Sequence, residues 1–428
     1  MKILLIGNGG RENAIARSIF HSPSYKRTKG KMYCTTGSPG IDRFAEPVDI
    51  KATELEALVN FAKTKGIDFT VVGPEIPLAL GIVDEFTKNG LKIFGPSKNA
   101  ARIESSKKYA KELMQFNGIP TAKFKVFGKA DIEAAKDYLN SVSYPVVVKA
   151  DGLAAGKGVI IADNQESAEE TIDSFIKEEI FGESGFTFVI EEFIEGNEVS
   201  VFAITDGEDY VILPVSQDHK KIGEGETGKN TGGMGAYSPA SKFLDEELLM
   251  EVKELIIDRT LYALSNDKSK FKGCLYAGLM IDKKRKPYVI EFNCRFGDPE
   301  TQVVLPLIKS DFLELLMASA EGRIKDYKLE TFNETCAGVV LASDGYPDEY
   351  EKGKEVTGLD NVDSDCIVFH AGTSYGINRE VITNGGRVFN IVCKGKNLKE
   401  ALEKVYRNID KIKFDNIYFR KDIGFKSL

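Results

Sequence analysis

The sequence contains no tryptophan, only three histidines, and six cysteines without a C-x-x-C pair. Protein zinc sites are built from closely spaced Cys and His ligands, so a zinc site is not expected. A chain of 428 residues also does not need disulfides to stabilise it. We therefore expect reduced thiols, in a cytoplasmic protein, at all six positions: Cys34, Cys274, Cys294, Cys336, Cys366 and Cys393.

Long apolar runs and an excess of positive charge are also missing. No run approaches the roughly 18 apolar residues of a membrane helix, and the start MKILLIGNGG has no signal-peptide pattern. The net charge of −8 argues against broad binding to a nucleic-acid backbone. The composition is that of a globular protein, and the length predicts two to four domains, with neither nucleic acid nor membrane as a partner.

The first hundred residues alternate short Ile- and Val-rich strands with helical stretches. This alternation predicts a doubly wound parallel sheet. The expected strands are 2–6, 31–35, 67–72 and 92–94, and the expected helices are 12–20, 54–65 and 78–88. A longer helix over 100–116 follows, and we place the first domain boundary just before it.

The middle of the chain has a different texture. The pattern predicts strands at 145–149, 159–162 and 188–191 around one helix at 168–179, then a helix at 246–264 and a hairpin of 275–281 with 288–292. The glycine-dense tract 223–235 cannot hold regular structure cheaply, so an irregular loop that is mobile or shaped by a ligand is expected there. From about Thr331, strands at 336–342 and 388–393 and a helix at 398–410 predict a closing α+β domain.

The loop Gly7-Asn-Gly-Gly-Arg-Glu12 joins the first strand to the first helix, where backbone N–H groups favour an anion. A nicotinamide oxidoreductase is the obvious reading, but the third glycine of G-x-G-x-x-G is replaced by Glu12, and strand 31–35 ends without an acid for a ribose. A tight turn without a ligand remains an alternative. The loop better suits a small phosphorylated ligand.

A second glycine motif, at 223–229, matches the G-x-x-x-x-G-K pattern of a P-loop. It lacks the preceding strand and the following helix of a P-loop, so a P-loop is not expected there.

A stronger constellation is spread along the middle of the chain. Lys149 ends a buried strand and Lys157 follows in a glycine loop, an arrangement that can clamp adjacent phosphates. Strand 188–191 offers backbone groups for an adenine edge, and Glu198 a carboxylate for ribose. Glu291 and Asn293 fall on one face of a strand, where their oxygens suit magnesium.

These residues resemble the ATP-grasp superfamily and, within it, the phosphoribosylamine–glycine ligase family. The resemblance runs over the whole chain. Its segments are 7–12, 72–75 (VGPE), 93–96 (IFGP), 149–159, 216–220 (SQDHK), 230–239 (NTGGMGAYSP), 291–301 (EFNCRFGDPET), 370–373 (HAGT), 383–387 (TNGGR) and 420–422 (RKD).

The resemblance implies three domains: an N-terminal substrate-binding α/β domain (1–101), an ATP-grasp domain (102–330) with a lid subdomain at about 121–191, and a C-terminal α+β domain (331–428). It also implies an ATP site and a Mg²⁺ or Mn²⁺ site. The ATP-binding residues would be Lys107, Lys149, Lys157, Glu191, Phe193, Ile194 and Glu198, with the Ile194 backbone on adenine; Glu291 and Asn293 would hold the metal.

The implied reaction joins glycine to 5-phosphoribosylamine through glycyl phosphate, with Arg295, Lys157 and Asp218 as catalytic residues. The substrate-binding residues would be Gly9, Gly10, Arg11, Glu12, Asp218, Arg295, Gly297 and Asp298. Three alternatives remain: an ATP-grasp carboxylase of a purine intermediate, a nicotinamide-dependent oxidoreductase and a non-catalytic nucleotide-binding protein. We expect a monomer, with weak contacts to neighbouring enzymes of purine synthesis.

Two positions depart from the family pattern. Asn13 replaces the usual histidine of the first loop, which leaves that position a hydrogen-bonding role but no titrating one. The strand before Glu291 lacks the acidic third metal ligand found in many ATP-grasp proteins, so the metal would depend more on phosphate and water.

Overall fold

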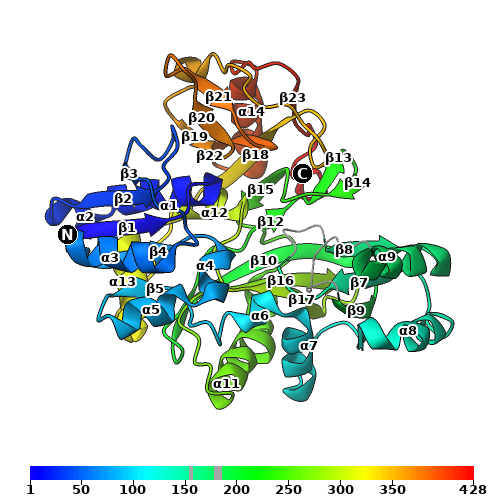
Figure 1. Cartoon of the computed structure of the whole chain (residues 1–428). Coiled ribbons are helices and arrows are strands. Elements are labelled where there is room, and N and C mark those ends of the chain that lie inside the picture. The colour runs from blue at the N-terminus through cyan, green and yellow to red at the C-terminus, as the bar shows by residue number, and fades with distance from the viewer. Residues whose placement is uncertain (154–157, 178–185) are drawn as a thin grey trace.

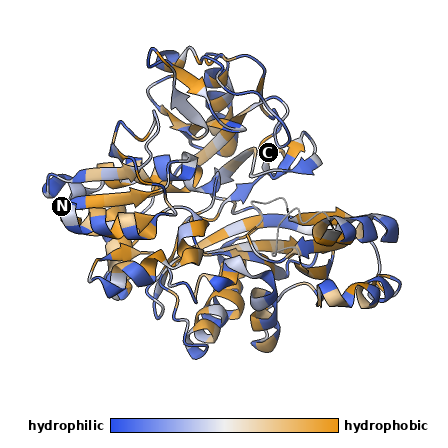
Figure 2. Ribbon diagram, viewed as in Figure 1, coloured by the Kyte–Doolittle hydropathy of each residue, from blue (hydrophilic) through white to orange (hydrophobic). Residues whose placement is uncertain are grey.

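A computed structural model describes residues 1–153, 158–177 and 186–428 (Figure 1). Lys157 therefore lies outside the described residues. Hydrophobic residues are concentrated in the strands of the interior, and hydrophilic residues on the outward-facing helices and loops (Figure 2).

The N-terminal unit is a parallel five-stranded sheet of order β3-β2-β1-β4-β5. Its strands are β1 (Lys2–Ile6), β2 (Lys31–Thr35), β3 (Glu46–Val48), β4 (Phe69–Val72) and β5 (Ile93–Phe94). Its helices are α1 (Gly10–His21), α2 (Pro23–Arg27), α3 (Leu55–Lys65), α4 (Glu75–Leu80) and α5 (Ile82–Lys88). Alternate residues of β1 pack into two different cores: Leu4 and Ile6 into one, Ile3 and Leu5 into the other. Burial on both faces confirms the predicted doubly wound sheet; β3 was not predicted.

Two long helices expected from the sequence are each broken in two. The helix expected over 78–88 is divided between α4 and α5 at Gly81, which has a φ of 96° that favours glycine. The helix expected over 100–116 is divided into α6 (Arg102–Ser105) and α7 (Lys107–Phe116). Ser106 between them is extended, and its side chain accepts a hydrogen bond from the N–H of Tyr109, so it caps α7.

The next unit is an antiparallel four-stranded sheet of order β6-β9-β7-β8 with its own core. Its elements are β6 (Phe124–Gly128), α8 (Ile132–Leu139), β7 (Val146–Ala150), β8 (Val159–Ala162), α9 (Gln165–Lys177) and β9 (Thr187–Glu192). The three predicted strands are confirmed; α8 was missed. That this unit is a lid stays a prediction.

A second four-stranded sheet, of order β11-β10-β16-β17, lies at the centre of the molecule (Figure 1). Its strands are β10 (Gly196–Thr205), β11 (Tyr210–Ile212), β16 (Gly273–Asp282) and β17 (Pro287–Asn293), and the predicted β16–β17 hairpin is confirmed. The same part of the chain forms α10 (Glu246–Val252), a π-helical segment η3 (Lys253–Asp258), α11 (Arg259–Asn266), α12 (Glu300–Val304) and α13 (Phe312–Glu321); of these, α12 packs against β15 and α1.

The C-terminal unit is built on the path β12-β15-β18-β22-β19, with β23 on β18. Its elements are β12 (Gln217–Asp218), β15 (Gly235–Ser238), β18 (Thr335–Ser343), β19 (Cys366–His370), β22 (Arg387–Gly395), α14 (Leu398–Ile409) and β23 (Ile417–Tyr418); β20 (Thr373–Tyr375) pairs with β21 (Val381–Thr383). Strands β12 and β15 come from before residue 330, so this sheet crosses the proposed limit at 330/331.

The glycine-dense tract is more regular than expected. Most of it forms the hairpin of β13 (Lys221–Gly223) and β14 (Thr227–Asn230), and β15 begins at its end. Gly225 and Glu226 at the turn both have positive φ angles. The prediction of an irregular loop was wrong because residues at the far end of the chain hold this hairpin: Tyr418 and Arg420 donate hydrogen bonds to its carbonyl groups.

The prediction that all six cysteines are reduced was also wrong. A disulfide joins Cys366 and Cys393, which are paired residues of β19 and β22 with Cα atoms 4.5 Å apart. Strand register brings them together across 27 residues, and no sequence motif marks the pair. The other cysteines are free and buried: Cys34, Cys274, Cys294 and Cys336.

Candidate ligand-binding and catalytic site

The predicted metal ligands lie at the end of β17. The Nδ2 atom of Asn293 is 3.5 Å from Oε1 of Glu291, so the two side chains share one face of the strand. Burial by itself would raise the pKa of Glu291, but the positive charges of Lys220, Lys149 and Lys107 outweigh it and lower that pKa to about 2. Glu291 is therefore an ionised carboxylate beside the amide of Asn293, whose Nδ2 faces Glu291 and whose Oδ1 accepts a hydrogen bond from Arg295.

A buried ion-pair cluster lies behind this strand end. The Nζ atoms of Lys149 and Lys111 are 3.0 and 2.9 Å from the same oxygen, Oε2 of Glu191. Oε1 of Glu191 is buried and accepts no hydrogen bond from the described residues. Burial lowers the pKa of Lys111 to about 8, although Glu191 acts in the opposite direction. Lys111 was missed; its spacing of four from Lys107 on α7 was the available signal.

Lys107 starts α7 and points toward the same region. Its Nζ donates to the carbonyl oxygen of Gly152 at 2.8 Å, and burial lowers its pKa. Phe193 and Ile194 follow β9; Phe193 is exposed and Ile194 half-buried. These residues therefore lie around the end of β9, where an adenine edge was predicted to bind.

A second cluster joins β10, β12 and β17. The Nζ atom of Lys220 contacts Oε1 of Glu198 and lies 3.6 Å from Oε1 of Glu291. Asp218, two residues before Lys220, is the last residue of β12. Burial raises the pKa of Asp218 well above its usual range, and its Oδ1 has no hydrogen-bond partner among the described residues. Lys220 was not assigned a role, although the segment 216–220 that contains it was singled out.

Two arginines connect the N-terminal sheet to the end of β17. The NH2 atom of Arg295 is 3.0 Å from Oε1 of Glu104, and its Nε is 3.3 Å from Oε2 of Glu75. NH2 also donates to Oδ1 of Asn293 at 3.0 Å. Arg11 lies 2.6 Å from Glu12 and 3.9 Å from Glu75. Burial would lower the pKa of Arg295, but Glu104 and Glu75 raise it. Sequence reasoning gave neither glutamate a role, although Glu75 ends the singled-out segment 72–75.

The first glycine loop is filled by a side chain of its own helix. Oε2 of Glu12 accepts a hydrogen bond from the N–H of Gly9 at 2.7 Å, and a Cβ atom placed on Gly7 or Gly73 would lie within 2.7 Å of Glu12. A Cβ on Gly10 would lie 2.8 Å from Nε2 of Gln302. The loop is therefore held close to both β4 and α12.

The remaining predicted residues lie in the loop before α12. Oδ1 of Asp298 accepts from Nε2 of Gln302 at 2.7 Å, and Oδ2 is 2.9 Å from NH2 of Arg387 on β22. A Cβ on Gly297 would collide with Glu300 at 2.6 Å. Arg387 and Gln302 were not predicted; Arg387 ends the singled-out segment 383–387.

Asn13 keeps a hydrogen-bonding role, as its side chain allows. Its Oδ1 accepts from the backbone N–H of His370 at 2.8 Å, which joins α1 to β19.

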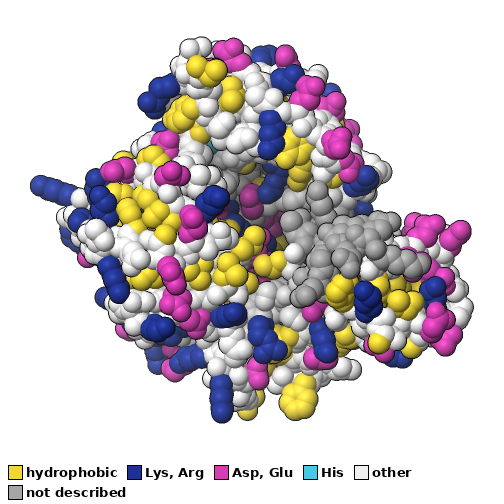
Figure 3. Space-filling view, viewed as in Figure 1, with side chains coloured by type: hydrophobic (Ala, Val, Ile, Leu, Met, Phe, Trp, Pro, Cys, Tyr) yellow, Lys and Arg dark blue, Asp and Glu magenta, His cyan; other side chains and the backbone are white. Residues whose placement is uncertain are grey.

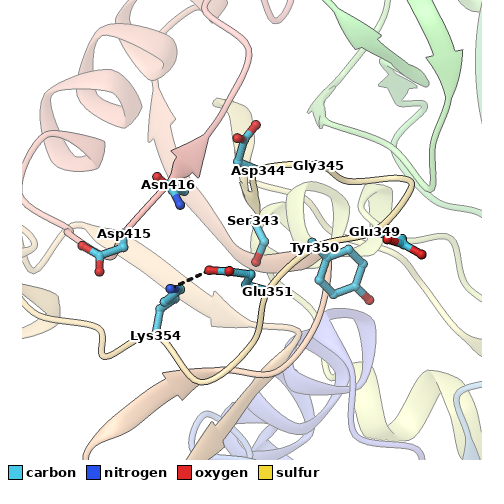
Figure 4. Close-up of a pocket in the computed structure, with 9 residues that line it drawn as sticks. All are labelled: Ser343, Asp344, Gly345, Glu349, Tyr350, Glu351, Lys354, Asp415 and Asn416. Carbon is cyan, nitrogen blue, oxygen red and sulfur yellow. Dashed lines mark ion pairs between the residues drawn. The ribbon is translucent and has the colours of Figure 1, made fainter.

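The structure thus brings the described members of the predicted set, from three units, around one region. Figure 3 shows a hollow near the middle of the molecule, between the C-terminal unit and the two sheets below it, where basic and acidic side chains lie together. A separate cavity of about 410 Å³ lies in the C-terminal unit, where Lys354 and Glu351 form an ion pair (Figure 4). It contains none of the predicted site residues.

Comparison with known proteins decides which family this arrangement belongs to. Models described as the phosphoribosylglycinamide synthetase N domain, ATP-grasp (A) domain and C domain match residues 1–104, 105–301 and 336–426. A phosphoribosylamine–glycine ligase of Caldanaerobacter subterraneus subsp. tengcongensis is 48% identical over 424 residues, which cover 99% of each chain. The chain belongs to the phosphoribosylamine–glycine ligase family. The resemblance predicted from the sequence is confirmed.

Other members of the phosphoribosylamine–glycine ligase family give the same result. The enzyme of Halalkalibacterium halodurans is 45% identical over 428 residues, which cover 100% of this chain and 97% of that one. The crystal structure of the Thermotoga maritima phosphoribosylamine–glycine ligase matches with a TM-score of 0.83 at 32% identity, over 99% of this chain and 100% of that one. The predicted fold class, with its ATP-grasp domain, is confirmed.

A biotin carboxylase of Campylobacter jejuni shares the fold, with a TM-score of 0.75 over 99% of this chain and 94% of that one. At 19% identity this likeness concerns the fold alone.

None of the helices in the described residues has both the length and the apolar composition of a membrane span.

The donor set at the end of β17 fits a divalent cation that arrives with other ligands. An ionised carboxylate and an amide oxygen are hard ligands, and Mg²⁺ takes about six oxygen ligands, several of them water or phosphate. The described residues contain no group of three or more His, Cys, Asp or Glu side chains that could hold a metal alone. Glu291 and Asn293 can thus supply part of a coordination shell that phosphate oxygens complete.

Proposed function

We propose that the chain joins glycine to 5-phosphoribosylamine with ATP, giving glycinamide ribonucleotide, ADP and phosphate. The observation that carries the proposal is the meeting of lysines, carboxylates and an arginine at the end of β17, in a member of this ligase family. Such a site can hold a triphosphate and an amino acid carboxylate together.

In the proposed arrangement, the nucleotide lies between the four-stranded sheet of β6–β9 and the central sheet. The backbone of Ile194 and the side chains of Glu191 and Phe193 would contact adenine, and Glu198 the ribose. Lys107, Lys149 and Lys157 would hold the phosphates. Glu291 and Asn293 would hold Mg²⁺ or Mn²⁺, which when bound would neutralise part of the phosphate charge.

Glycine activation would depend mainly on Arg295. The glycine carboxylate attacks the γ-phosphorus, ADP leaves, and glycyl phosphate forms. Arg295 is suited to orient the carboxylate and stabilise the acyl phosphate, because its own position is fixed by Glu75 and Glu104. The amine of phosphoribosylamine then attacks the acyl carbon and displaces phosphate.

The second step releases a proton from the attacking amine. Asp218 is suited to accept it, because its Oδ1 has no hydrogen-bond partner among the described residues, and burial raises the pKa of its carboxyl, which makes the ionised form a stronger base than an exposed carboxylate. Asp298 and Gly297 would bind amino and carboxyl groups of the substrates. Gly9, Gly10, Arg11 and Glu12 would shape the phosphoribosylamine side of the site; in the structure Arg11 is already paired with Glu12.

The test is ADP release from ATP with Mg²⁺, with glycine and freshly prepared phosphoribosylamine each omitted in turn. Release that requires both substrates is expected. Release that does not depend on glycine overturns the proposal, and release that requires bicarbonate would indicate the carboxylase alternative.

We further propose that the protein is a cytoplasmic monomer. Weak contacts to neighbouring pathway enzymes are proposed as well, since phosphoribosylamine is short-lived and a nearby supplier would limit its loss.

A further inference from the structure

Lys220 occupies a position that the proposed reaction has not yet used. Its ammonium group contacts the carboxylate proposed to bind ribose, Glu198, and lies 3.6 Å from Oε1 of the proposed metal ligand, Glu291. The side chains of Glu198, Lys220 and Glu291 are 25%, 29% and 35% exposed, so the three groups face an accessible part of the site. One lysine therefore pairs with both carboxylates.

A divalent cation bound to Oε1 of Glu291 would lie only a few ångströms from this ammonium group. Mg²⁺ binds oxygen at roughly 2.0–2.1 Å, and two positive centres so close repel each other unless further negative charge is present. Arg295, which donates to Oδ1 of Asn293 at 3.0 Å, also engages the second ligand. Cationic side chains thus already occupy both proposed metal ligands: Lys220 lies beside the Glu291 carboxylate, and Arg295 holds the amide oxygen of Asn293.

We propose that Lys220 competes with the divalent cation for Glu291, so that the cation binds tightly only together with nucleotide phosphates. Phosphate oxygens supply negative charge for both positive centres, and Lys220 can then turn from Glu291 toward them. The inference rests on the proposed function for the identity of the metal ligand. It adds that Lys220 is the residue that sets the affinity of Glu291 for the cation.

The test measures binding of Mn²⁺ alone, without nucleotide, from the electron paramagnetic resonance signal of the free ion. We expect Lys220→Met to bind Mn²⁺ about tenfold or more tightly than the wild type, because a nearby positive charge has been removed. Lys220→Arg keeps the charge and should stay close to the wild type. Lys229→Met is the matched control, since Lys229 lies on the adjacent hairpin and pairs with exposed Asp348.

Two outcomes overturn the inference: equal Mn²⁺ affinity of Lys220→Met and the wild type, or a gain that persists in Lys220→Met/Glu291→Gln. Thermal unfolding of each variant shows that it is folded. The metal assignment is tested separately, by Mn²⁺ binding of Glu291→Gln in the presence of a non-hydrolysable ATP analogue. Unchanged binding there contradicts the proposed metal ligand whatever Lys220→Met does.

Discussion

His219 stands between the site residues Asp218 and Lys220 in the sequence, and its imidazole is buried. Its Nε2 accepts a hydrogen bond from the backbone N–H of Gly424 at 3.0 Å, so this nitrogen carries no proton. Burial, aided by the positive charge of Arg420, lowers the pKa of His219 to about 3. The native protein therefore keeps a neutral ring here well below neutral pH.

This buried ring makes the free energy of unfolding depend on pH below neutrality. Between pH 6.5 and about 3 the unfolded chain binds a proton at His219 and the native chain does not, so the free energy of unfolding falls as pH drops below 6.5. One such group contributes about 1.4 kcal/mol per pH unit. We expect His219→Gln, whose amide oxygen can still accept from Gly424, to show a shallower decline in urea unfolding from pH 7 to 4.5. His21→Gln, at the exposed end of α1, should keep the wild-type decline.

Lys111 provides a second test at the level of one residue. It and Glu191 are each only 3% exposed and 2.9 Å apart, and Lys149 contacts the same oxygen, so removing Lys111 leaves Glu191 with one cation instead of two. We expect Lys111→Met to lower the free energy of unfolding by about 1–3 kcal/mol, because a buried charge-assisted hydrogen bond is lost. The exposed pair of Lys31 and Glu46 provides the control, and Lys31→Met should change little. Equal effects of the two variants would contradict the structural role of the buried cluster.

At the scale of elements, the hairpin β13–β14 depends on the end of the chain. The guanidinium of Arg420, fully buried, donates to the carbonyl of Lys221 and pairs with Glu226 and Asp422. Asp422 in turn accepts from the N–H of Gly225. Because Lys220 directly precedes this hairpin, the chain end also supports the site.

Removing that support should loosen the hairpin. We expect amide hydrogen exchange of Thr227–Asn230 to be about tenfold faster or more in Arg420→Met, because a charge-assisted hydrogen bond contributes about 1.5–3 kcal/mol. Lys229→Met, which breaks only an exposed pair on the same hairpin, should leave the exchange of the neighbouring amides close to that of the wild type. Mass spectrometry of peptic fragments measures both.

The same contacts explain which elements could be predicted from sequence. Strands such as β1 and β17 are recognisable because burial requires continuous or alternating apolar residues. The breaks at Gly81 and Ser106 depend on one residue's backbone, and the glycine-dense hairpin depends on Arg420, about 195 residues away. Likewise, the predicted metal ligands Glu291 and Asn293 were recognisable from their i, i+2 spacing. Glu104 joins the site only through tertiary contacts with Arg295 and Cys294.

At the scale of the whole molecule, the C-terminal unit reaches the site through Arg387. From β22 this residue donates to the carbonyls of Asp298 and Gly232 and pairs with the Asp298 carboxylate. It thereby holds the loop before α12 against β15.

We expect Arg387→Met to lower kcat/KM for glycine about tenfold or more, because charge-assisted hydrogen bonds that position the loop are lost. Arg387→Lys should recover part of this loss. Steady-state ADP release at varied glycine measures both, and thermal unfolding identifies general destabilisation. An unchanged kcat/KM in Arg387→Met would show that the loop is positioned without the C-terminal unit.

Glu75 has a consequence for how such a chain can be rebuilt from parts. It lies in the N-terminal unit, yet it is shared by Arg11 of that unit and Arg295 of the central one, and Glu104 holds Arg295 from the other side. A hybrid that takes residues 1–101 from another protein therefore leaves Arg295 short of a charge partner unless the donor also has an acid at this place. The N-terminal and central units have separate sheets, but one can be exchanged only together with the residues of the other that its charges pair with.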